Sequence, residues 1–517
     1  MNIRSSLLLG TSFLLGTGTV GARQIRRPHI ILIMTDQQRG DCLGVQHSVV
    51  KTPNLDALAR EGFCFDRGYS TTPSSTPARA ALLTGLSPWH HGMMGYGVVA
   101  EHYRYEMPRM LRENGYYTFG IGKMHWFPQK TLHGFHGTLV DESGRVEQNG
   151  FVSDYRDWFK LNAPGQNPDA LGIGWNDHKG GVYPLDEKLH PTWWTGEMAV
   201  EFIHHYKSDK PLFLKVSFAR PHSPYDPPQR YLDMYSEVKI PEPAIGEWAA
   251  GFADRPQTAD AAFGDFGVEH AVESRRYYYA AITFVDDQIG RVIQALKEEG
   301  LYEDAVICFV SDHGDMLGDH YHWRKTYAYE GSSHIPYLLR LPAWMQGERK
   351  QGEHLSHVVE LRDILPTFLD IAGAEIPEDL DGASLLPLLR EKHARWREYI
   401  DLEHATCYNA DNYWCGLTDG KMKYIWFFRT GEEQLFDLSR DPQEKTDLSA
   451  QKEYRKVLEL WRKRMIEHLE ERGEEFVKDG QLQKLQNTYL YSPNYPQDKR
   501  SKRDKLKDWK RDSRFEE

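Results

Sequence analysis

Four short apolar runs, well separated along the chain, have the length and composition of β-strands that are buried on both faces. They cover residues 29–35, 117–121, 211–218 and 305–310. Stretches with apolar residues at helical spacing lie between them, at 55–61, 107–114, 195–206 and 274–299. This alternation predicts an α/β fold in which a large, mostly parallel central sheet is flanked by helices.

Beyond about residue 395 the pattern changes to short runs typical of an antiparallel sheet. Residues 399–404, 413–418, 422–428 and 434–438 are predicted strands, and an amphipathic helix is predicted at 452–471. We therefore predict an N-terminal α/β domain over residues 23–395 and a smaller C-terminal α+β subdomain, a short antiparallel sheet plus a helix, over 396–485. A charged tail over 486–517 is interpreted as a solvated end, with a lid or a ligand-contacting arm as the alternative.

The first 22 residues are typical of a cleavable secretory signal. Arg4 precedes an apolar region at 7–15, and small residues end it at Val20-Gly21-Ala22. Cleavage near Ala22 would export the protein. A periplasmic location is favoured over a lipid anchor, because no cysteine follows the apolar region at a lipoprotein position. No later stretch approaches eighteen apolar residues, so we expect no membrane span.

Composition limits the classes of partner. The 517 residues are 40% hydrophobic and 12% aromatic, which is enough for a substantial globular core. The formal net charge of −12 argues against nucleic-acid binding, although it leaves room for a local basic pocket. The five cysteines form no C-x-x-C pair, so buried thiols and a bridge between Cys407 and Cys415 both stay open.

Charged and ligating residues follow each of the four predicted strands. In open α/β sheets the ligand lies beyond the carboxyl ends of the strands, so these ends converge on one region. The residues are Asp36 and Gln37, Lys123 and His125, His222, and Asp312 and His313. Four convergent ends predict a functional site. Residues 126–190, rich in Gly, Asn, Trp and Tyr, are expected to form long loops around it.

A further contribution to this site is the stretch Ser75-Thr76-Pro77-Ala78-Arg79-Ala80-Ala81-Leu82-Leu83-Thr84-Gly85. Pro77 suits the first position of a helix, which places Ser75 at the helix mouth, beside unpaired N–H groups and the positive end of the dipole. Such a place suits an anion. Alone, the pattern also fits a serine-capped helix start; its partners elsewhere in the chain favour a functional role.

These eleven residues resemble the signature of the type I, formylglycine-dependent sulfatases of the alkaline phosphatase superfamily. Three further motifs resemble the family, so the resemblance covers about residues 30–475. They are Gly122-Lys123-Met124-His125, the segment from Asp312-His313-Gly314 to Arg324-Lys325, and Leu435-Phe436-Asp437-Leu438. The resemblance implies that Ser75 is oxidised to formylglycine (3-oxoalanine). Serine at this position resembles bacterial members that a radical-SAM sulfatase-maturating enzyme modifies.

The resemblance also implies one divalent cation, usually Ca²⁺, bound by Asp36, Gln37, Asp312, His313 and the modified Ser75. Oxygen ligands suit such hard cations. Two positions depart from the family's more familiar pattern, which has Asp where Gln37 stands and often Asn where His313 stands. Nitrogen suits calcium less well, so either His313 contacts a sulfate oxygen or ligand instead, or the cation is not calcium. Asp312 is also expected to deprotonate the nucleophile.

Roles for the other site residues follow from the same resemblance. One hydroxyl of the hydrated formylglycine attacks sulfur in line, while Arg79 holds the other. Lys123 and Lys325, with the cation, neutralise the sulfate oxygens. His222, as imidazolium, protonates the departing alkoxide. His125 takes a proton from the remaining hydroxyl, so that sulfate is expelled.

The expected substrate is an O-sulfate on a carbohydrate, and a glycosaminoglycan saccharide, with uronate 2-O-sulfate as one candidate, is the leading hypothesis. Aromatic and basic residues in or near the predicted loops are candidates for sugar contacts: Trp126, His190, Trp193, Trp194, Arg220, His320, Trp323, Arg324, His404 and Trp414. Two other functions stay open. They are hydrolysis of a phosphoester or phosphonate monoester on the same scaffold, and sulfoglycan binding without turnover if Ser75 is not oxidised.

Overall fold

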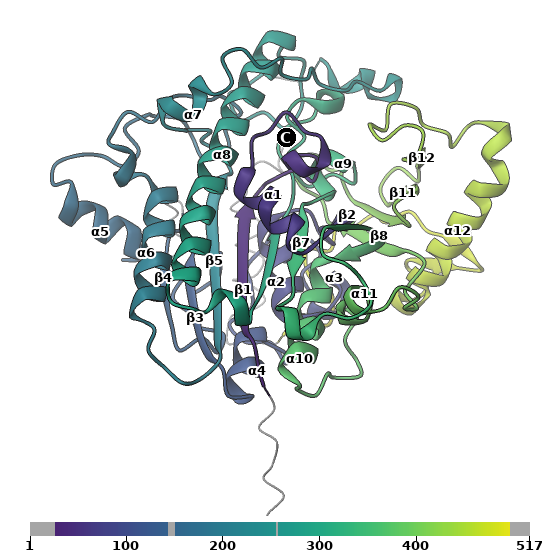
Figure 1. Ribbon diagram of the computed structural model, residues 1–517. Coiled ribbons are helices and arrows are strands. Elements are labelled where there is room, and N and C mark those ends of the chain that lie inside the picture. Colours follow the sequence, from purple (N-terminus) through teal and green to yellow (C-terminus); the bar gives the residue numbers. More distant parts are fainter. Residues whose placement is uncertain (1–25, 143–149, 255–256, 497–517) are drawn as a thin grey trace, which may run out of the picture.

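The computed structural model describes residues 26–142, 150–254 and 257–496, and Figure 1 shows its central sheet, helical layers and C-terminal lobe. The sheet has eight strands in the order β4-β3-β5-β1-β6-β7-β2-β8. They are β1 (His29–Asp36), β2 (Phe63–Tyr69), β3 (Tyr117–Gly122), β4 (Gly137–Val140), β5 (Leu212–Pro221), β6 (Ala305–Ser311), β7 (Tyr337–Arg340) and β8 (Glu353–Glu360). Neighbouring strands are parallel except where β7 pairs with β6 and β2, which confirms the predicted mostly parallel sheet.

Helices cover both faces of the sheet, because apolar side chains of β1 alternate between them. Ile31 and Ile33 belong to the cluster on one face, and Ile30 and Leu32 to the cluster on the other. The first face packs against α1 (Pro53–Arg60), α6 (Pro191–His205) and α8 (Val268–Glu298). The second packs against α2 (Ser75–Thr84), α4 (Met107–Glu113) and α10 (Ile364–Ala372). Each fully buried aliphatic side chain contributes about 1.5–3 kcal/mol.

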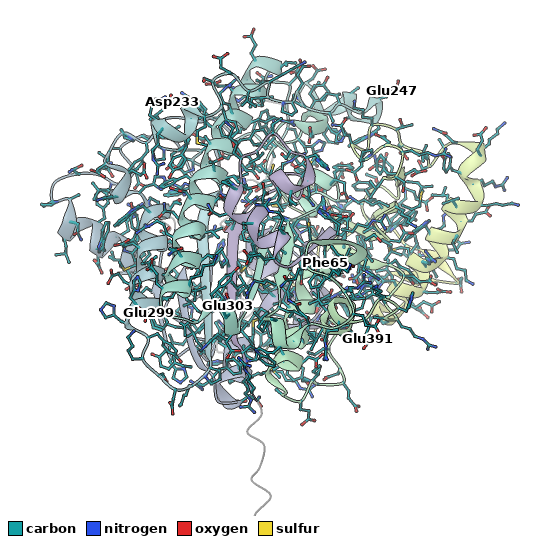
Figure 2. All side chains as sticks on the ribbon, in the orientation of Figure 1. Phe65, Asp233, Glu247, Glu299, Glu303 and Glu391 are labelled. Carbon is teal, nitrogen blue, oxygen red and sulfur yellow. The ribbon has the colours of Figure 1, made fainter. Side chains whose placement is uncertain are left out.

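The side chains fill the space between these layers. In Figure 2, Phe65 lies in the interior, whereas Glu247 and Glu391 lie at the periphery. All five cysteines are buried as thiols. The shorter helices are connections: α3 (Pro88–His91), α5 (Asp154–Asn162), α7 (Gln229–Asp233), α9 (Glu330–Ser333) and α11 (Leu386–Arg390).

The strand register brings the carboxyl ends of the central strands to one level. β1 pairs with β6 up to Thr35 opposite Ser311, and with β5 up to Asp36 opposite Pro221. The residues that follow these strands therefore leave the sheet side by side. This geometry gathers the candidate site residues at one edge of the sheet.

The C-terminal lobe, yellow-green in Figure 1, has its own antiparallel sheet in the order β12-β11-β10-β9. Its elements are β9 (Ile400–His404), β10 (Trp414–Thr418), β11 (Met422–Phe427), β12 (Glu433–Asp437), α12 (Arg455–Leu469), β13 (Val477–Lys478) and β14 (Gln481–Leu482). Trp461 and Met465 of α12 pack with Leu417 and Tyr424 of the sheet. The predicted short antiparallel sheet plus helix is confirmed, whereas the domain boundary near residue 395 stays a prediction.

The four predicted strands of the large sheet correspond to β1, β3, β5 and β6, whereas β2, β4, β7 and β8 were not predicted. The segment 126–190, expected as loops, also contains β4 and α5. Over the ranges that the structure describes, no helix has the length and apolar character needed to cross a membrane. The predicted signal, residues 1–22, and residues 497–517 of the charged tail lie outside these ranges.

Candidate active site

Two buried carboxylates form the centre of the site. Asp36 ends β1 and Asp312 directly follows β6, and neither side chain is exposed. Arg79 lies between them: its Nη2 is 3.3 Å from Asp36 Oδ2, and its Nε donates to Asp312 Oδ2 at 2.9 Å. Burial by itself raises the pKa of Asp36, but nearby basic groups, Lys123 foremost, hold that pKa well below its usual range. Asp36 is therefore ionised at neutral pH.

Ser75 faces this pair as the first residue of α2. Ser74 precedes it in an extended conformation, typical of a helix N-cap. The Ser75 hydroxyl lies 3.3 Å from Asp36 Oδ2 and 3.1 Å from His313 Nε2. The helix begins at Ser75, two residues before Pro77, which corrects the predicted start. Pro77 still falls in the first turn, where its missing N–H needs no partner.

Asp36, Asp312 and His313 form a group that fits a divalent cation, since one ligand atom from each lies within 4.8 Å of the others. His313 Nδ1 donates to the Gly314 carbonyl at 2.9 Å, so its Nε2 carries no proton. This Nε2 lies 3.8 Å from Asp36 Oδ1 and 3.6 Å from Asp312 Oδ1. Burial lowers the pKa of His313, which keeps it a neutral ligand. Asp36 Oδ1 is buried and accepts no hydrogen bond within the described ranges. A cation would complete this arrangement.

Gln37 has partners other than the expected cation. Its Nε2 donates to Asp315 Oδ2, and its Oε1 accepts a hydrogen bond from Lys325 Nζ at 2.7 Å. The backbone is left-handed, with a φ of 73°, and Tyr278 OH donates to the Gln37 carbonyl. Protein groups thus occupy both ends of the amide. These contacts let Gln37 position Lys325, and its expected role as a metal ligand stays a prediction.

Lys325 and His222 form a hydrogen-bonded pair. Lys325 Nζ is 2.7 Å from His222 Nε2, and His222 Nδ1 donates to the Ser223 carbonyl at 2.9 Å. Burial lowers the pKa of Lys325 to about 7. Burial, with the charges of Lys325 and Lys123, lowers the pKa of His222 well below its usual value. The pair therefore carries at most one proton near neutral pH; that proton lies on Lys325 and is lost as pH rises through about 7. The imidazolium expected at His222 is not the resting state.

Lys123 and His125 follow β3 and are both buried. Lys123 Nζ pairs with Asp36, and its carbonyl accepts a hydrogen bond from Arg79 Nη1 at 2.6 Å. The His125 N–H donates to Glu142 Oε1 at 3.0 Å, and its ring packs edge-on against Tyr96, with centroids 5.9 Å apart. Lys123 thus belongs to the carboxylate cluster, while the role expected of His125 stays a prediction.

Two partners of the site, Asp315 and Ser217, were not predicted, and a third, His404, was predicted only as a candidate sugar contact. Asp315 accepts hydrogen bonds from Gln37 and, at 2.6 Å, from Tyr225 OH. Ser217 Oγ, inside β5, accepts one from Arg79 Nη1 at 3.0 Å, and His404 Nε2 in the small sheet lies 2.7 Å from Ser74 Oγ. The position of Asp315, three residues after Asp312, was a usable signal. Nothing in the local sequence indicates these contacts of Ser217 and His404, because the residues that they contact are far away along the chain.

Most aromatic candidates for sugar contacts are packing residues. Trp126, Trp194, Trp323 and Trp414 are each at most 2% exposed. His404 likewise is completely buried. Their enrichment near the predicted loops therefore reflects the core that supports the site.

Cationic groups surround the Ser75 hydroxyl beside residues that fit a divalent ion. Such a site favours in-line attack on an ester of a tetrahedral oxyanion, because positive charge offsets the charge that redistributes in the transition state. With the mostly parallel sheet, this arrangement fits a hydrolase of the alkaline phosphatase superfamily. The family model described as Sulfatase matches residues 28–374, and a model for the C-terminal part of N-sulphoglucosamine sulphohydrolase matches 318–471. The chain belongs to the sulfatase family and is a hydrolase of sulfate esters.

Named relatives agree with this assignment. An arylsulfatase of Clostridium perfringens is 39% identical over 477 residues, which cover 89% of this chain and 98% of the relative. An N-acetylglucosamine-6-O-sulfatase of Bacteroides thetaiotaomicron is 27% identical over 524 residues, covering 88% and 87%. The structure of a phosphonate monoester hydrolase of Agrobacterium radiobacter superposes with a TM-score of 0.70 at 25% identity, covering 86% of this chain and 96% of that one.

Proposed function

We propose that this sulfatase hydrolyses an O-sulfate ester on a carbohydrate, with Ser75 oxidised to formylglycine as its nucleophile. The observation that carries the proposal is the Ser75 hydroxyl, 3.3 Å from Asp36 and 3.1 Å from His313 within the group that fits a cation. The N-acetylglucosamine-6-O-sulfatase relative supports a sugar substrate. We favour a glycosaminoglycan saccharide, with uronate 2-O-sulfate as one candidate position.

Two groups would complete the site. Asp36, Asp312 and His313, with the oxidised Ser75, would hold one divalent cation. The two carboxylates favour Ca²⁺, which we propose, and the nitrogen of His313 makes a divalent ion that accepts nitrogen more readily the alternative. When bound, the cation supplies positive charge at the nucleophile and the sulfate oxygens. The aldehyde of formylglycine supplies a way to release sulfate that an ordinary serine ester lacks. A radical-SAM maturase is the proposed partner in biogenesis, and the signal at residues 1–22 supports export to the periplasm.

The chain's own residues orient the groups and move protons. Asp312 and Ser217 fix Arg79, so its charge stays beside Ser75. Lys123 brings a second positive charge to the carboxylates, where it offsets charge on the sulfate oxygens. We assign to Asp312 the removal of the nucleophile's proton.

Protonation of the leaving sugar oxygen falls to the Lys325–His222 pair. Lys325 holds the shared proton, and its Nζ and His222 Nε2 are 2.7 Å apart, so the proton can pass from Lys325 through His222 to the leaving oxygen. His125 is assigned the proton released when sulfate departs. After turnover, solvent returns a proton to Lys325.

A phosphoester or phosphonate monoester is the second candidate substrate. The phosphonate monoester hydrolase of Agrobacterium radiobacter shares the fold, and tetrahedral oxyanions share most of these contacts. Binding of a sulfoglycan without turnover would follow if Ser75 stayed unmodified.

One experiment separates these functions. Protein co-produced with a maturase should carry a Ser75 peptide lighter by about 2 Da, because CH₂OH becomes CHO. This protein should release sulfate from an aryl sulfate faster than it cleaves the matching phosphate and phosphonate monoesters. Ser75→Ala, which loses only a hydroxyl, is the inactive control. Unmodified Ser75 in an active preparation would exclude the formylglycine proposal, and a higher kcat/KM on the phosphorus esters would select the second candidate.

A further inference from the structure

Arg324 differs from every other buried arginine in the described part of the chain. Eight arginines are buried, and seven of them lie within 4.0 Å of a carboxylate oxygen. These seven are Arg39, Arg79, Arg220, Arg275, Arg340, Arg362 and Arg472. Arg324, which is 3% exposed, has no ion pair with any described residue. A buried guanidinium without an anion is costly, so a missing anionic partner is the simplest explanation for it.

The guanidinium of Arg324 stacks on an aromatic ring and makes no hydrogen bond with any described residue. It lies 4.2 Å above the ring of Tyr408, a cation–π contact that fixes its plane. Its Nε and Nη1 are buried and have no hydrogen-bond partner within the described ranges. Each of these donors forms a fork with Nη2, and either fork matches the oxygens of a carboxylate or a sulfate.

The backbone of Arg324 lies beside the sulfate site. Arg324 directly precedes Lys325, whose Nζ contacts Gln37 and His222. Asp315 Oδ1 accepts the Arg324 N–H at 2.9 Å, while Oδ2 of the same carboxylate accepts Gln37 Nε2. The Arg324 backbone is left-handed, with a φ of 67°. One carboxylate thus positions both the arginine and the amide that orients Lys325.

Arg220, the other arginine at a strand end of the site, does not offer the same opportunity. Its Nε and Nη2 donate to the two oxygens of Asp226 at 2.6 and 2.7 Å. The ion pair neutralises Arg220 within the protein. Arg324 is therefore the buried arginine whose charge is left for a ligand.

We propose that Arg324 binds a second anionic group of the substrate, a carboxylate or a further sulfate, next to the sulfate ester that is cleaved. The substrate class is then a sugar that carries at least two negative charges. This inference rests on the proposed function, because it assigns a specificity residue to the same site. Sugars whose only charged group is the sulfate ester that is cleaved would leave the Arg324 donors unpaired and would bind less well.

Matched aryl esters test the inference without knowledge of the natural sugar. We would measure kcat/KM of the matured enzyme on sulfooxybenzoates that carry the carboxylate at each ring position, and on their uncharged methyl esters. Bis-sulfates of the three benzenediols form the second arm. Wild-type enzyme should prefer at least one charged ester, and Arg324→Gln should lower that preference about 10- to 100-fold. The arm with the larger change identifies the anion as carboxylate or sulfate.

Arg340→Gln is the matched control. Arg340 is equally buried and lies 3.9 Å over the ring of Tyr302, but it binds the Ala305 carbonyl at the start of β6, the opposite end of that strand. We expect it to lower the melting temperature without changing the charged-to-uncharged ratio. If Arg324→Gln fails to fold, Arg324→Lys keeps a charge, loses the fork, and should lose part of the preference.

The outcomes separate this inference from the proposed function. Absence of sulfate release from every aryl sulfate by the matured wild type would reject the proposed function itself. Hydrolysis of aryl sulfates with no preference for any charged ester would overturn only the role of Arg324. Equal losses on charged and uncharged esters in Arg324→Gln would also overturn it, because they would show a purely structural residue.

Discussion

The Lys325–His222 pair gives the sharpest prediction about mechanism. The two nitrogens are 2.7 Å apart, His222 Nδ1 is committed to the Ser223 carbonyl, and the pair carries at most one proton near neutral pH. Two groups that share a proton act as one acid. His222→Ala and Lys325→Ala should therefore each remove most of the acid assistance, and the double variant should be little worse than the more damaging single variant.

The expected magnitude follows from general acid catalysis. Loss of a positioned acid typically costs about 10²–10⁴-fold on a substrate with a basic leaving group, such as a sugar alkoxide. If the two residues acted independently, the double variant would lose about 10⁴–10⁸-fold, the product of two such factors. The loss should be distinctly smaller on a nitrophenyl sulfate, because nitrophenolate departs almost unaided.

The assay is kcat/KM of wild type, both single variants and the double variant on a sulfated sugar and on nitrophenyl sulfate. Lys123→Ala is the contrasting variant. Lys123 pairs with Asp36 and is assigned to the sulfate, which both substrates share, so its losses should be equal on both. Multiplicative losses in the double variant, or equal losses of His222→Ala on both substrates, would refute the shared-proton acid.

Two further predictions concern the cation and the pH dependence of stability. A chelator should lower both sulfate release and the melting temperature, because a bound ion stabilises the native state, and Ca²⁺ should restore both; unchanged values would argue against a cation at Asp36 and Asp312. His90, bound to Asp381 and Glu471, has a pKa raised to about 9, so its contribution to stability is complete below the unfolded pKa of about 6.5 and disappears as pH rises through about 9. Because His90 is partly exposed, we expect no more than about 1 kcal/mol, measured by urea unfolding at pH 6 and pH 10, and the same pH dependence in His90→Gln would contradict this origin.

Strands that are buried along nearly their whole length were the easiest to predict from the sequence. β1, β5 and β6 are buried along nearly their whole length, so they appear as continuous apolar runs. β2 contains Asp66 and Arg67, β8 is an edge strand with exposed positions, and β7 has only four residues. None of these three carries the apolar run of a central strand, and only tertiary pairing identifies them.

The same distinction applies to the site. Asp36, Lys123, His222 and Asp312 could be predicted together because each directly follows a strand, and parallel strand ends meet at one edge. The partners of Gln37 could not be predicted in this way. They depend on how the chain after β6 folds back, which only the three-dimensional structure shows.

The complete burial of α2 limits the time during which Ser75 can be modified. All ten residues of α2, Ser75 included, are buried, so an oxidising enzyme can reach Ser75 only before this helix packs. Asp312, which binds Arg79 of this helix, follows β6 and lies about 240 residues further along the chain. At roughly 5–20 residues per second, translation needs roughly 10–50 s to cover this distance. If Ser75 is oxidised as proposed, the spacing between α2 and β6 gives the modifying enzyme this interval before the sheet can close.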